Sequence, residues 1–337
     1  MIRLLLVTAI ALTVSCNSAQ NAASAKKMTA EDYASTITSE ELKTHLYILA
    51  DDKMQGRMTG ENSNNEAAEF LRNYYMDQGI DSPIEKNNYY QPIPAEFFKG
   101  GTNGNPSQNV VAFIEGSEKP DEIIVLSAHY DHVGVKNGKI YNGADDDGSG
   151  TVTLMEMAQA FKIAKDNGNG PKRSILILHV TGEEIGLYGS KYYTENPLFP
   201  LENTVVNLNT DMIGRIGSEK EGNDNYIYLI GSDKLSQELH DLSEAVNKKY
   251  TNLELDYTYN DDNDPNRFYY RSDHYNFAKN NIPVIFYFNG THEDYHQPGD
   301  TPDKIEYELM AKRAQLIFLT AWEIANREGR ITADKLK

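Results

Sequence analysis

A strand that ends in two adjacent carboxylates constrains the fold of this chain more than any other feature. Residues 174–180 read Ser-Ile-Leu-Ile-Leu-His-Val, and Glu183 and Glu184 follow after a Thr-Gly pair. An apolar run of this length is typical of a strand buried on both faces, as in the parallel sheet of an α/β domain. Ligands of such sheets bind at the carboxyl ends of the strands. The two glutamates are therefore candidate functional residues, with a solvated acidic turn as the alternative.

Strands and helices alternate along the rest of the chain. This alternation predicts an α/β fold, a three-layer α/β/α sandwich with a mixed, mostly parallel central sheet. The periodicity places helices at residues 38–51, 64–78, 150–165, 235–248 and 304–326, and strands at residues 109–115, 122–128, 174–180, 204–209, 226–230 and 283–288. Loops are expected at residues 54–63 and 88–108.

The N-terminus has the features of an export signal. A basic residue, an apolar run at residues 4–14 and a small residue precede Cys16, which is the pattern of a secretory signal. Cys16 resembles the lipid-attachment cysteine of bacterial lipoproteins, although Thr13 stands where that signal usually has an aliphatic residue. We expect an exported protein of the periplasm or cell envelope, attached to the membrane through lipidated Cys16. Secretion after ordinary signal cleavage is the alternative.

Composition indicates how the rest of the chain is organised. We expect residues 1–16 to be the signal peptide, residues 17–30 a flexible tether rich in Ala, Ser and Asn, and residues 31–337 a single domain. The chain has 337 residues, 39% of them hydrophobic, which is enough for a substantial core. Its net charge of −18 disfavours nucleic acid and anionic lipid as partners, because both carry negative charge.

Other predicted strands also end in candidate ligands. His129 and Asp131 follow the strand at residues 122–128, and an Asp at this spacing can hydrogen-bond the far ring nitrogen of a metal-binding histidine. A structural histidine is the alternative. Asp211 follows the strand at residues 204–209, and either His292 or His296 could complete the set after the last strand.

Three consecutive aspartates precede the helix predicted at residues 150–165. Residues 143–150 read Gly-Ala-Asp-Asp-Asp-Gly-Ser-Gly. One Asp could cap that helix, but three without a balancing Lys or Arg call for a cation. The mixture of His, Asp and Glu suits zinc, with cobalt or manganese as substitutes. Five ligands, with one carboxylate bridging through both oxygens, match a site for two metal ions.

These motifs resemble those of the di-zinc aminopeptidase family of metallopeptidases. That family includes secreted bacterial leucyl aminopeptidases, glutamate carboxypeptidases and, as a divergent branch, glutaminyl cyclases. The resemblance extends over residues 42–325. It is carried by His129-x-Asp131, residues 143–150, Glu183-Glu184-x-Gly186-Leu187-x-Gly189-Ser190, Asp211-Met212-x-Gly214, Ser272-Asp273-His274 and Tyr295-His296-x-Pro298-x-Asp300-Thr301.

The resemblance implies a role for each candidate. It assigns His129 and Asp211 to one zinc ion, Glu184 and His296 to the other, Asp146 as the bridge and Glu183 as the general base. It also implies a cis bond between Asp146 and Asp147, supporting positions for Asp131 and Asp147, and a place near the substrate for His274. We add Arg271 and Tyr270 as candidate substrate contacts. The inserted protease-associated domain of the family is expected to be absent.

The implied function is a zinc-dependent exopeptidase, an aminopeptidase that hydrolyses N-terminal residues of peptides. A glutaminyl cyclase holding one zinc ion, and a carboxypeptidase with Arg271 in a basic pocket, are the alternatives on the same fold. A surface lipoprotein that uses its metal only for binding is an alternative of another class. The acidic residues 260–266 could bind calcium through their oxygens, but a solvated turn is the expected state.

Overall fold

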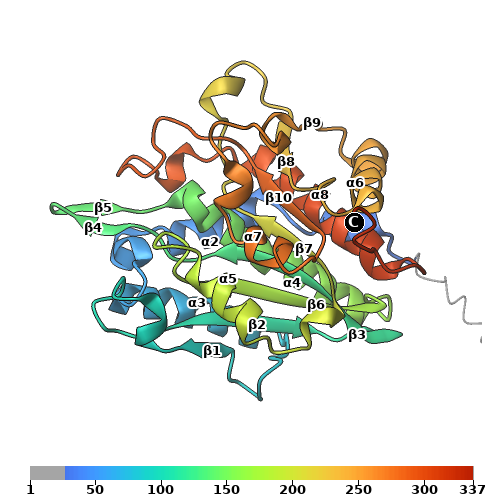
Figure 1. The fold of residues 1–337 in the computed structure, drawn as a ribbon, viewed down its shortest axis with the longest axis horizontal. Helices are drawn as coiled ribbons and strands as arrows, with labels where there is room; N and C mark the ends of the chain where they lie inside the picture. The colour runs from blue at the N-terminus through green and yellow to red at the C-terminus, as the bar shows by residue number, and fades with distance from the viewer. Residues whose placement is uncertain (1–26, 337) are drawn as a thin grey trace, which may run out of the picture.

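An eight-stranded sheet forms the centre of the computed structural model, which describes residues 27–336. Its strand order is β1-β2-β6-β3-β7-β10-β8-β9 (Figure 1). The four inner strands β6, β3, β7 and β10 run parallel, and β2 and β8 join them antiparallel on either side. The strands are β1 (Tyr90–Ile93), β2 (Ser107–Ile114), β3 (Lys119–His129), β6 (Arg173–Val180), β7 (Thr204–Thr210), β8 (Tyr226–Ile230), β9 (Glu254–Asp256) and β10 (Val284–Phe288). The predicted mixed, mostly parallel sheet is confirmed.

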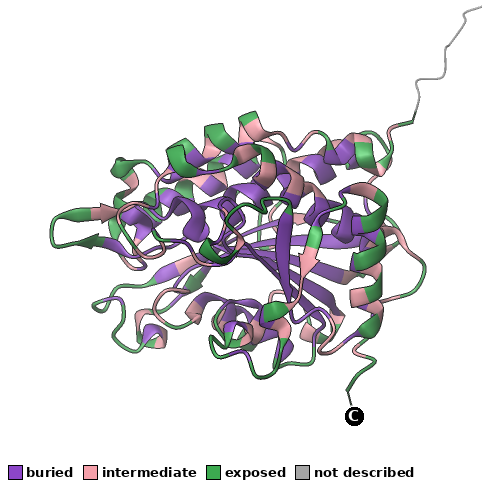
Figure 2. Ribbon diagram, turned by 90° about the horizontal axis from the view of Figure 1, so that it is seen from above, coloured by how far each residue is buried: buried purple, intermediate pink, exposed green. Residues whose placement is uncertain are grey.

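Helices cover both faces of this sheet, and Figure 2 shows the buried strands between them. One core cluster packs α1 (Ala30–Ala34), α2 (Ser39–Leu49), α3 (Asn62–Asp77), α4 (Gly150–Asp166), α6 (Gln237–Tyr250) and α8 (Tyr307–Asn326) against one face. A second cluster packs α5 (Tyr188–Glu195) and α7 (His274–Ala278) against the other. Alternation along each strand explains the two clusters, because successive side chains of a strand point to opposite faces.

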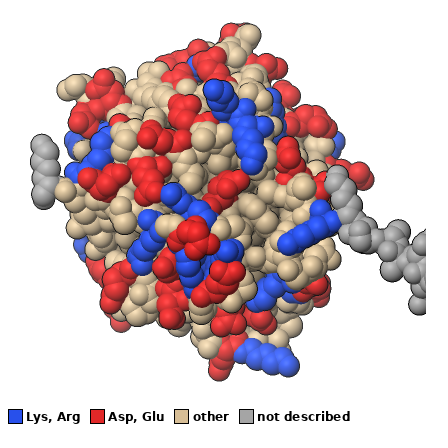
Figure 3. Space-filling model, turned by 90° about the vertical axis from the view of Figure 1, so that its right-hand side faces the viewer, with Lys and Arg blue, Asp and Glu red and all other residues tan. Residues whose placement is uncertain are grey.

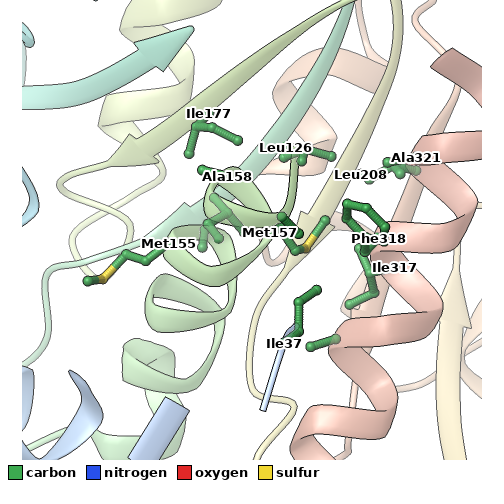
Figure 4. Packing of buried hydrophobic residues seen from close by; sticks show 14 of the residues in the cluster. Ile37, Leu126, Met155, Met157, Ala158, Ile177, Leu208, Ile317, Phe318 and Ala321 are labelled. Atoms are coloured by element: carbon green, nitrogen blue, oxygen red, sulfur yellow. The ribbon is translucent and has the colours of Figure 1, made fainter. Parts of the chain in front are cut away.

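Strand β3 illustrates this alternation. Ile124 and Leu126 belong to the first cluster, whereas Val125 belongs to the second. Figure 4 shows Leu126 in the first cluster near side chains of α4 and α8, among them Met157 and Phe318. All eight residues of β6 are buried, as an apolar strand at the centre of a three-layer domain requires.

The structure adds short elements that the sequence did not predict. They are β1, β9, α5, α7 and the hairpin of β4 (Gly134–Lys136) and β5 (Lys139–Tyr141), and a helical turn, Asp52–Arg57, occupies part of the expected loop. None of them is longer than the eight residues of α5, so their periodicity is too brief to detect.

The first described helix lies near the expected N-terminal boundary of the domain. Helix α1 begins at Ala30, and Thr29 forms a capping box with Asp32, so this helix starts at the last residue of the tether expected at residues 17–30. The expected signal, Cys16 and most of that tether lie outside the described residues. Within residues 27–336, no helix is both long and apolar enough to cross a bilayer.

Candidate metal centre

The carboxyl ends of the parallel strands bring the predicted ligands together. His129 is the last residue of β3, and Asp211 directly follows β7. Glu184 follows β6, and His296 lies in the loop after β10. Asp146 lies in the turn Ala144–Ser149, immediately before α4. Parallel strands of one sheet end at the same edge, which is why residues so far apart in sequence meet there.

A first group of donor atoms surrounds Nε2 of His129. This nitrogen lies 3.2 Å from Oδ1 of Asp146, 3.6 Å from Oδ1 of Asp211 and 3.9 Å from Oε2 of Glu183. His129, Glu183 and Asp211 offer ligand atoms within 4.8 Å of one another. One imidazole nitrogen among carboxylate oxygens is a donor set that suits zinc.

A second group lies beside the first. Nε2 of His296 is 3.0 Å from Oδ2 of Asp146 and 3.0 Å from Oε2 of Glu184. Asp146 therefore directs one oxygen to each group, the position that the resemblance assigned to a bridging carboxylate. The Asp146–Asp147 peptide is cis, as expected.

His132 joins the second group, and the sequence analysis did not single it out. Its buried Nδ1 lies 2.7 Å from Oε1 of Glu184 and 3.9 Å from Oδ2 of Asp146. These three residues form the other set of potential ligands within 4.8 Å of one another. The available signal was a second histidine in the loop that carries His129 and Asp131.

Unpaired buried atoms indicate that the two groups fit a metal ion. Among the described residues, Nε2 of His129, Nδ1 of His132, Oδ2 of Asp146 and Oε1 of Glu184 are buried without a hydrogen-bond partner. Burying polar atoms without partners is costly, and these four, one in the first group and three in the second, therefore indicate that each group fits a cation. Neutral imidazoles and carboxylates are also the ligand types that zinc prefers.

The charges of the second group depend on one another. Burial alone would raise the pKa of both Asp146 and Glu184. Contacts with histidines instead lower the pKa of Asp146 well below its usual range and that of Glu184 to about 2. Burial would lower the pKa of His296, but Asp146 and Glu184 raise it to about 10. The carboxylates of Asp146 and Glu184 thus favour a positive charge beside them. A bound metal ion would supply that charge in place of the proton on His296.

Asp131 and Asp147 lie next to the donor groups and contact the segments that carry the ligands. Nδ1 of His129 is 3.0 Å from the backbone oxygen of Asp131 but 3.7 Å from its Oδ1, so the expected carboxylate contact is replaced by a backbone one. The Asp131 carboxylate instead accepts from Thr59 Oγ1 at 2.8 Å. Asp147 accepts from the backbone N–H groups of His129, Gly150 and Met212 at 3.2, 2.9 and 3.1 Å, and so joins three loops.

His292, the other histidine that could have completed the ligand set, lies outside both groups. Its Nε2 is 3.1 Å from Oδ2 of Asp145, and Oδ1 of Asp145 accepts from the N–H of Gly214 at 2.7 Å. Asp300 accepts from the N–H groups of Asp145 and Asp146 at 3.0 and 3.1 Å. These side chains fix the aspartate turn in place.

A cavity opens beside the two groups. Asp146, Glu183, Asp211 and His296 line one side, and Met212, Phe268, Arg271, Phe286, Phe288 and Tyr295 line the rest. Of the three expected substrate contacts, only Arg271 lines this cavity. His274 is fully buried and stacks on Phe286 with ring centroids 4.8 Å apart, so it lies behind the wall. Tyr270 is 44% exposed and is not among the lining residues.

Comparison with known proteins agrees with this geometry. A probable zinc metalloprotease of Pyricularia oryzae is 27% identical over 263 residues, which are 66% of this chain and 51% of that protein. The chain thus spans about half the length of this curated relative. The crystal structure of the LapA aminopeptidase of Legionella pneumophila superposes with a TM-score of 0.68 at 21% identity, covering 89% of this chain and 75% of that one.

A third similarity concerns another branch of the same fold. The crystal structure of Porphyromonas gingivalis glutaminyl cyclase superposes with a TM-score of 0.65 at 18% identity, covering 84% of this chain and 97% of that one. Both structural similarities establish the fold. The sequence profile described as Peptidase family M28 matches residues 109–321, more than half of the chain, and this match includes every residue of the two donor groups. The chain belongs to peptidase family M28.

Proposed function

We propose that the protein is a zinc-dependent aminopeptidase that hydrolyses N-terminal residues of peptides. The observation that carries this proposal is the position of Asp146, whose two oxygens lie 3.2 Å from His129 and 3.0 Å from His296. His129 and Asp211 would hold one zinc ion, Glu184 and His296 a second, with Asp146 shared. Bound zinc lowers the pKa of a coordinated water and polarises a carbonyl group.

Glu183 is the candidate general base. Its carboxylate lines the cavity, and its Oε2 is 3.9 Å from Nε2 of His129. Burial raises the pKa of Glu183 well above its usual range, although His129 opposes the shift. A raised pKa suits a carboxylate that takes a proton from the attacking water and returns it to the leaving amine.

The cavity wall supports a preference for apolar N-terminal residues. Phe268, Phe286 and Phe288 line it together with Met212. Aromatic and thioether side chains offer few hydrogen bonds but a large apolar contact area. An N-terminal Leu or Phe would therefore gain contact there that Asp would not.

Two other activities use the same fold. The likeness to a glutaminyl cyclase supports a cyclase, but two donor groups sharing Asp146 favour two metal ions over one. Arg271 on the cavity wall supports a carboxypeptidase, because a guanidinium binds a C-terminal carboxylate well. The shared Asp146 favours a peptidase with two metal ions over the cyclase, and the likeness to the LapA aminopeptidase favours the aminopeptidase over the carboxypeptidase.

One assay separates these activities. The purified protein with zinc is given the p-nitroanilides of Leu, Phe and Asp, N-acetyl-Leu-p-nitroanilide, an N-acetylated peptide and a peptide beginning with Gln. We expect cleavage of the free Leu and Phe substrates only. Cyclisation of the Gln peptide would favour the cyclase, and loss of the C-terminal residue from the acetylated peptide the carboxypeptidase. No turnover with zinc, cobalt or manganese would favour a binding protein.

The charge distribution supports a peptide rather than a nucleic acid as substrate. The net charge is −18, and on the face drawn in Figure 3 the basic side chains lie among acidic ones. Lys172, for example, is 3.2 Å from Glu118 and 3.3 Å from Glu328. Paired bases such as this offer little attraction to a polyanion.

Export and lipid attachment at Cys16 are further parts of the proposal. Their support comes from the sequence, in which apolar residues 4–14 precede Cys16. Incorporation of labelled palmitate into the expressed protein, lost in Cys16→Ser, is the expected result. Equal labelling of both proteins, or of neither, would contradict lipid attachment at this residue.

A further inference from the structure

A fully buried arginine joins three chain segments at the edge of the metal centre. Arg57 is 0% exposed and ends the turn Asp52–Arg57 between α2 and α3. Among the residues that the structure describes, its guanidinium donates only to backbone carbonyl groups. The acceptors are those of Leu49 (3.0 Å), Tyr130 (2.8 Å), Asn142 (2.6 Å) and Gly143 (2.8 Å).

Two of these segments carry the donor residues. Tyr130 lies directly after His129 in sequence, and Gly143 lies three residues before Asp146. The backbone oxygen of Arg57 also accepts from the N–H of His132 at 3.4 Å. One residue therefore contacts the backbone beside members of both donor groups.

Burial makes these contacts costly to lose. No carboxylate of the described residues lies within ion-pair distance of Arg57, so carbonyl oxygens alone solvate its guanidinium. Burial lowers the pKa of Arg57 to about 10, with the nearby Asp300 and Asp131 opposing the shift, and the group stays charged at neutral pH. Separating the loops would leave buried charged N–H groups without acceptors, which is strongly unfavourable.

The turn that presents Arg57 is itself fixed. Gly56 has φ +67°, and a Cβ added there would lie 2.2 Å from the backbone oxygen of Tyr141 and 2.8 Å from that of Gly134. The turn is thus packed against the hairpin of β4 and β5 with no room for a side chain. The backbone that carries the Arg57 side chain is therefore fixed in position.

We propose that Arg57 is a positioning residue of the metal centre, which holds the loops of His129 and Asp146 at the separation at which both side chains reach one ion. This inference rests on the proposed function. A lysine keeps the charge, but its single nitrogen cannot donate in four directions to three segments as a planar guanidinium does. The conservative substitution therefore removes the geometry while keeping the charge.

Arg173 provides a matched control. It is equally buried but lies at the start of β6, at the opposite edge of the sheet from the donor groups. It too donates to backbone carbonyls, those of Ile324 in α8 and of Arg327 and Glu328 just after it, at 2.9, 2.6 and 3.1 Å. Unlike Arg57, it also pairs with a carboxylate, that of Glu122 at 2.5 Å. A lysine there should lower stability without changing the metal centre.

The experiment compares zinc affinity, measured by competition with a chromogenic chelator, and the rise in Tm on adding zinc. We expect Arg57→Lys to bind zinc about 10- to 100-fold more weakly than wild type, because this is the usual effect of losing a residue that orients metal ligands. Adding zinc should also raise the Tm of this variant by less than it raises the Tm of wild type. Arg173→Lys should have a lower Tm without metal but keep the affinity and the Tm rise. A purely structural role of Arg57 would give both variants the same pattern.

A second variant covers the case in which Arg57→Lys fails to fold. Arg57→Met removes the guanidinium together with its buried charge, so no charged N–H group is left without an acceptor, and it should weaken zinc binding in the same direction. Wild-type zinc affinity in a folded Arg57→Lys, or in Arg57→Met when the first variant does not fold, would overturn the positioning role alone. Failure of the wild-type protein to bind zinc would overturn the proposed function and this inference together.

Discussion

Nδ1 of His132 lies 2.7 Å from Oε1 of Glu184, and among the described residues neither of these buried atoms has a further hydrogen-bond partner. The other oxygen of Glu184 is 3.0 Å from Nε2 of His296. Glu184 therefore lies between two imidazoles. His132 either contributes a nitrogen to the second metal or holds Glu184 in the direction of that metal.

Both roles make the same prediction for the substitution His132→Asn. Zinc in the second group should bind about 10- to 100-fold more weakly, because residues that orient metal ligands typically contribute that much to affinity. Titration with zinc should then show one tight and one weakened site per chain. The same substitution at His240, on α6 outside the donor groups, is the control. Two sites of wild-type affinity in His132→Asn would contradict any role in the metal centre.

The role of Glu183 predicts a separation of activity from metal content. Glu183→Gln keeps the size of the side chain but removes its ability to take up a proton, so kcat should fall by about 100-fold or more. Zinc content should stay at the wild-type value, because Glu183 is not one of the proposed ligands. Glu184→Gln should instead lose zinc. Near-normal turnover by Glu183→Gln would exclude it as the base.

The sheet and most of the candidate ligands could be predicted from sequence because they follow local patterns. The run at residues 174–180 is mostly apolar, as is typical of a strand buried on both faces, and Glu183 and Glu184 follow after Thr181 and Gly182. Parallel strands end at one edge, so residues that are distant in sequence could be placed together without knowing any distance.

What could not be predicted depends on contacts between distant segments. Arg57 donates to the carbonyl of Gly143, 86 residues away, and backbone acceptors leave no pattern in the side-chain sequence. Asp131 had the right spacing, yet its backbone oxygen rather than its carboxylate approaches His129. His274 was expected near the substrate, and only the packing of Phe286 places it behind the cavity wall.

Arg271 distinguishes an aminopeptidase from a carboxypeptidase. Its guanidinium lies over the ring of Phe268 at 4.6 Å and donates to the hydroxyl of Tyr295 at 3.3 Å. If the substrate enters by its N-terminus, Arg271→Gln should change kcat/KM for Leu-p-nitroanilide, which has no carboxylate, by less than about tenfold, since the group lost makes at most a hydrogen bond there. Loss of activity confined to substrates with a free C-terminal carboxylate would instead identify a carboxypeptidase.

His179 predicts how stability depends on pH. It is fully buried on β6, with Nε2 2.5 Å from the hydroxyl of Tyr75, and burial lowers its pKa to about 3. Between pH 6.5 and 3 the unfolded chain binds a proton at this histidine that the folded chain does not. This contribution to stability is therefore complete above pH 6.5 and is lost as the pH falls toward 3, by about 1.4 kcal/mol per pH unit.

Urea unfolding of the metal-free protein at pH 7.5 and pH 5.0 measures this effect. Wild type should lose unfolding free energy when the pH is lowered from 7.5 to 5.0, and His179→Asn should lose about 2 kcal/mol less. The figure follows because 1.5 units of this pH interval lie below the pKa of about 6.5 that the histidine has in the unfolded chain. Tyr75→Phe is the control, because it removes the hydrogen bond but leaves His179 buried. It should lower stability by a similar amount at both pH values, since burial is the cause of the shift. An unchanged pH dependence in His179→Asn would mean that this histidine takes up its proton without unfolding the chain.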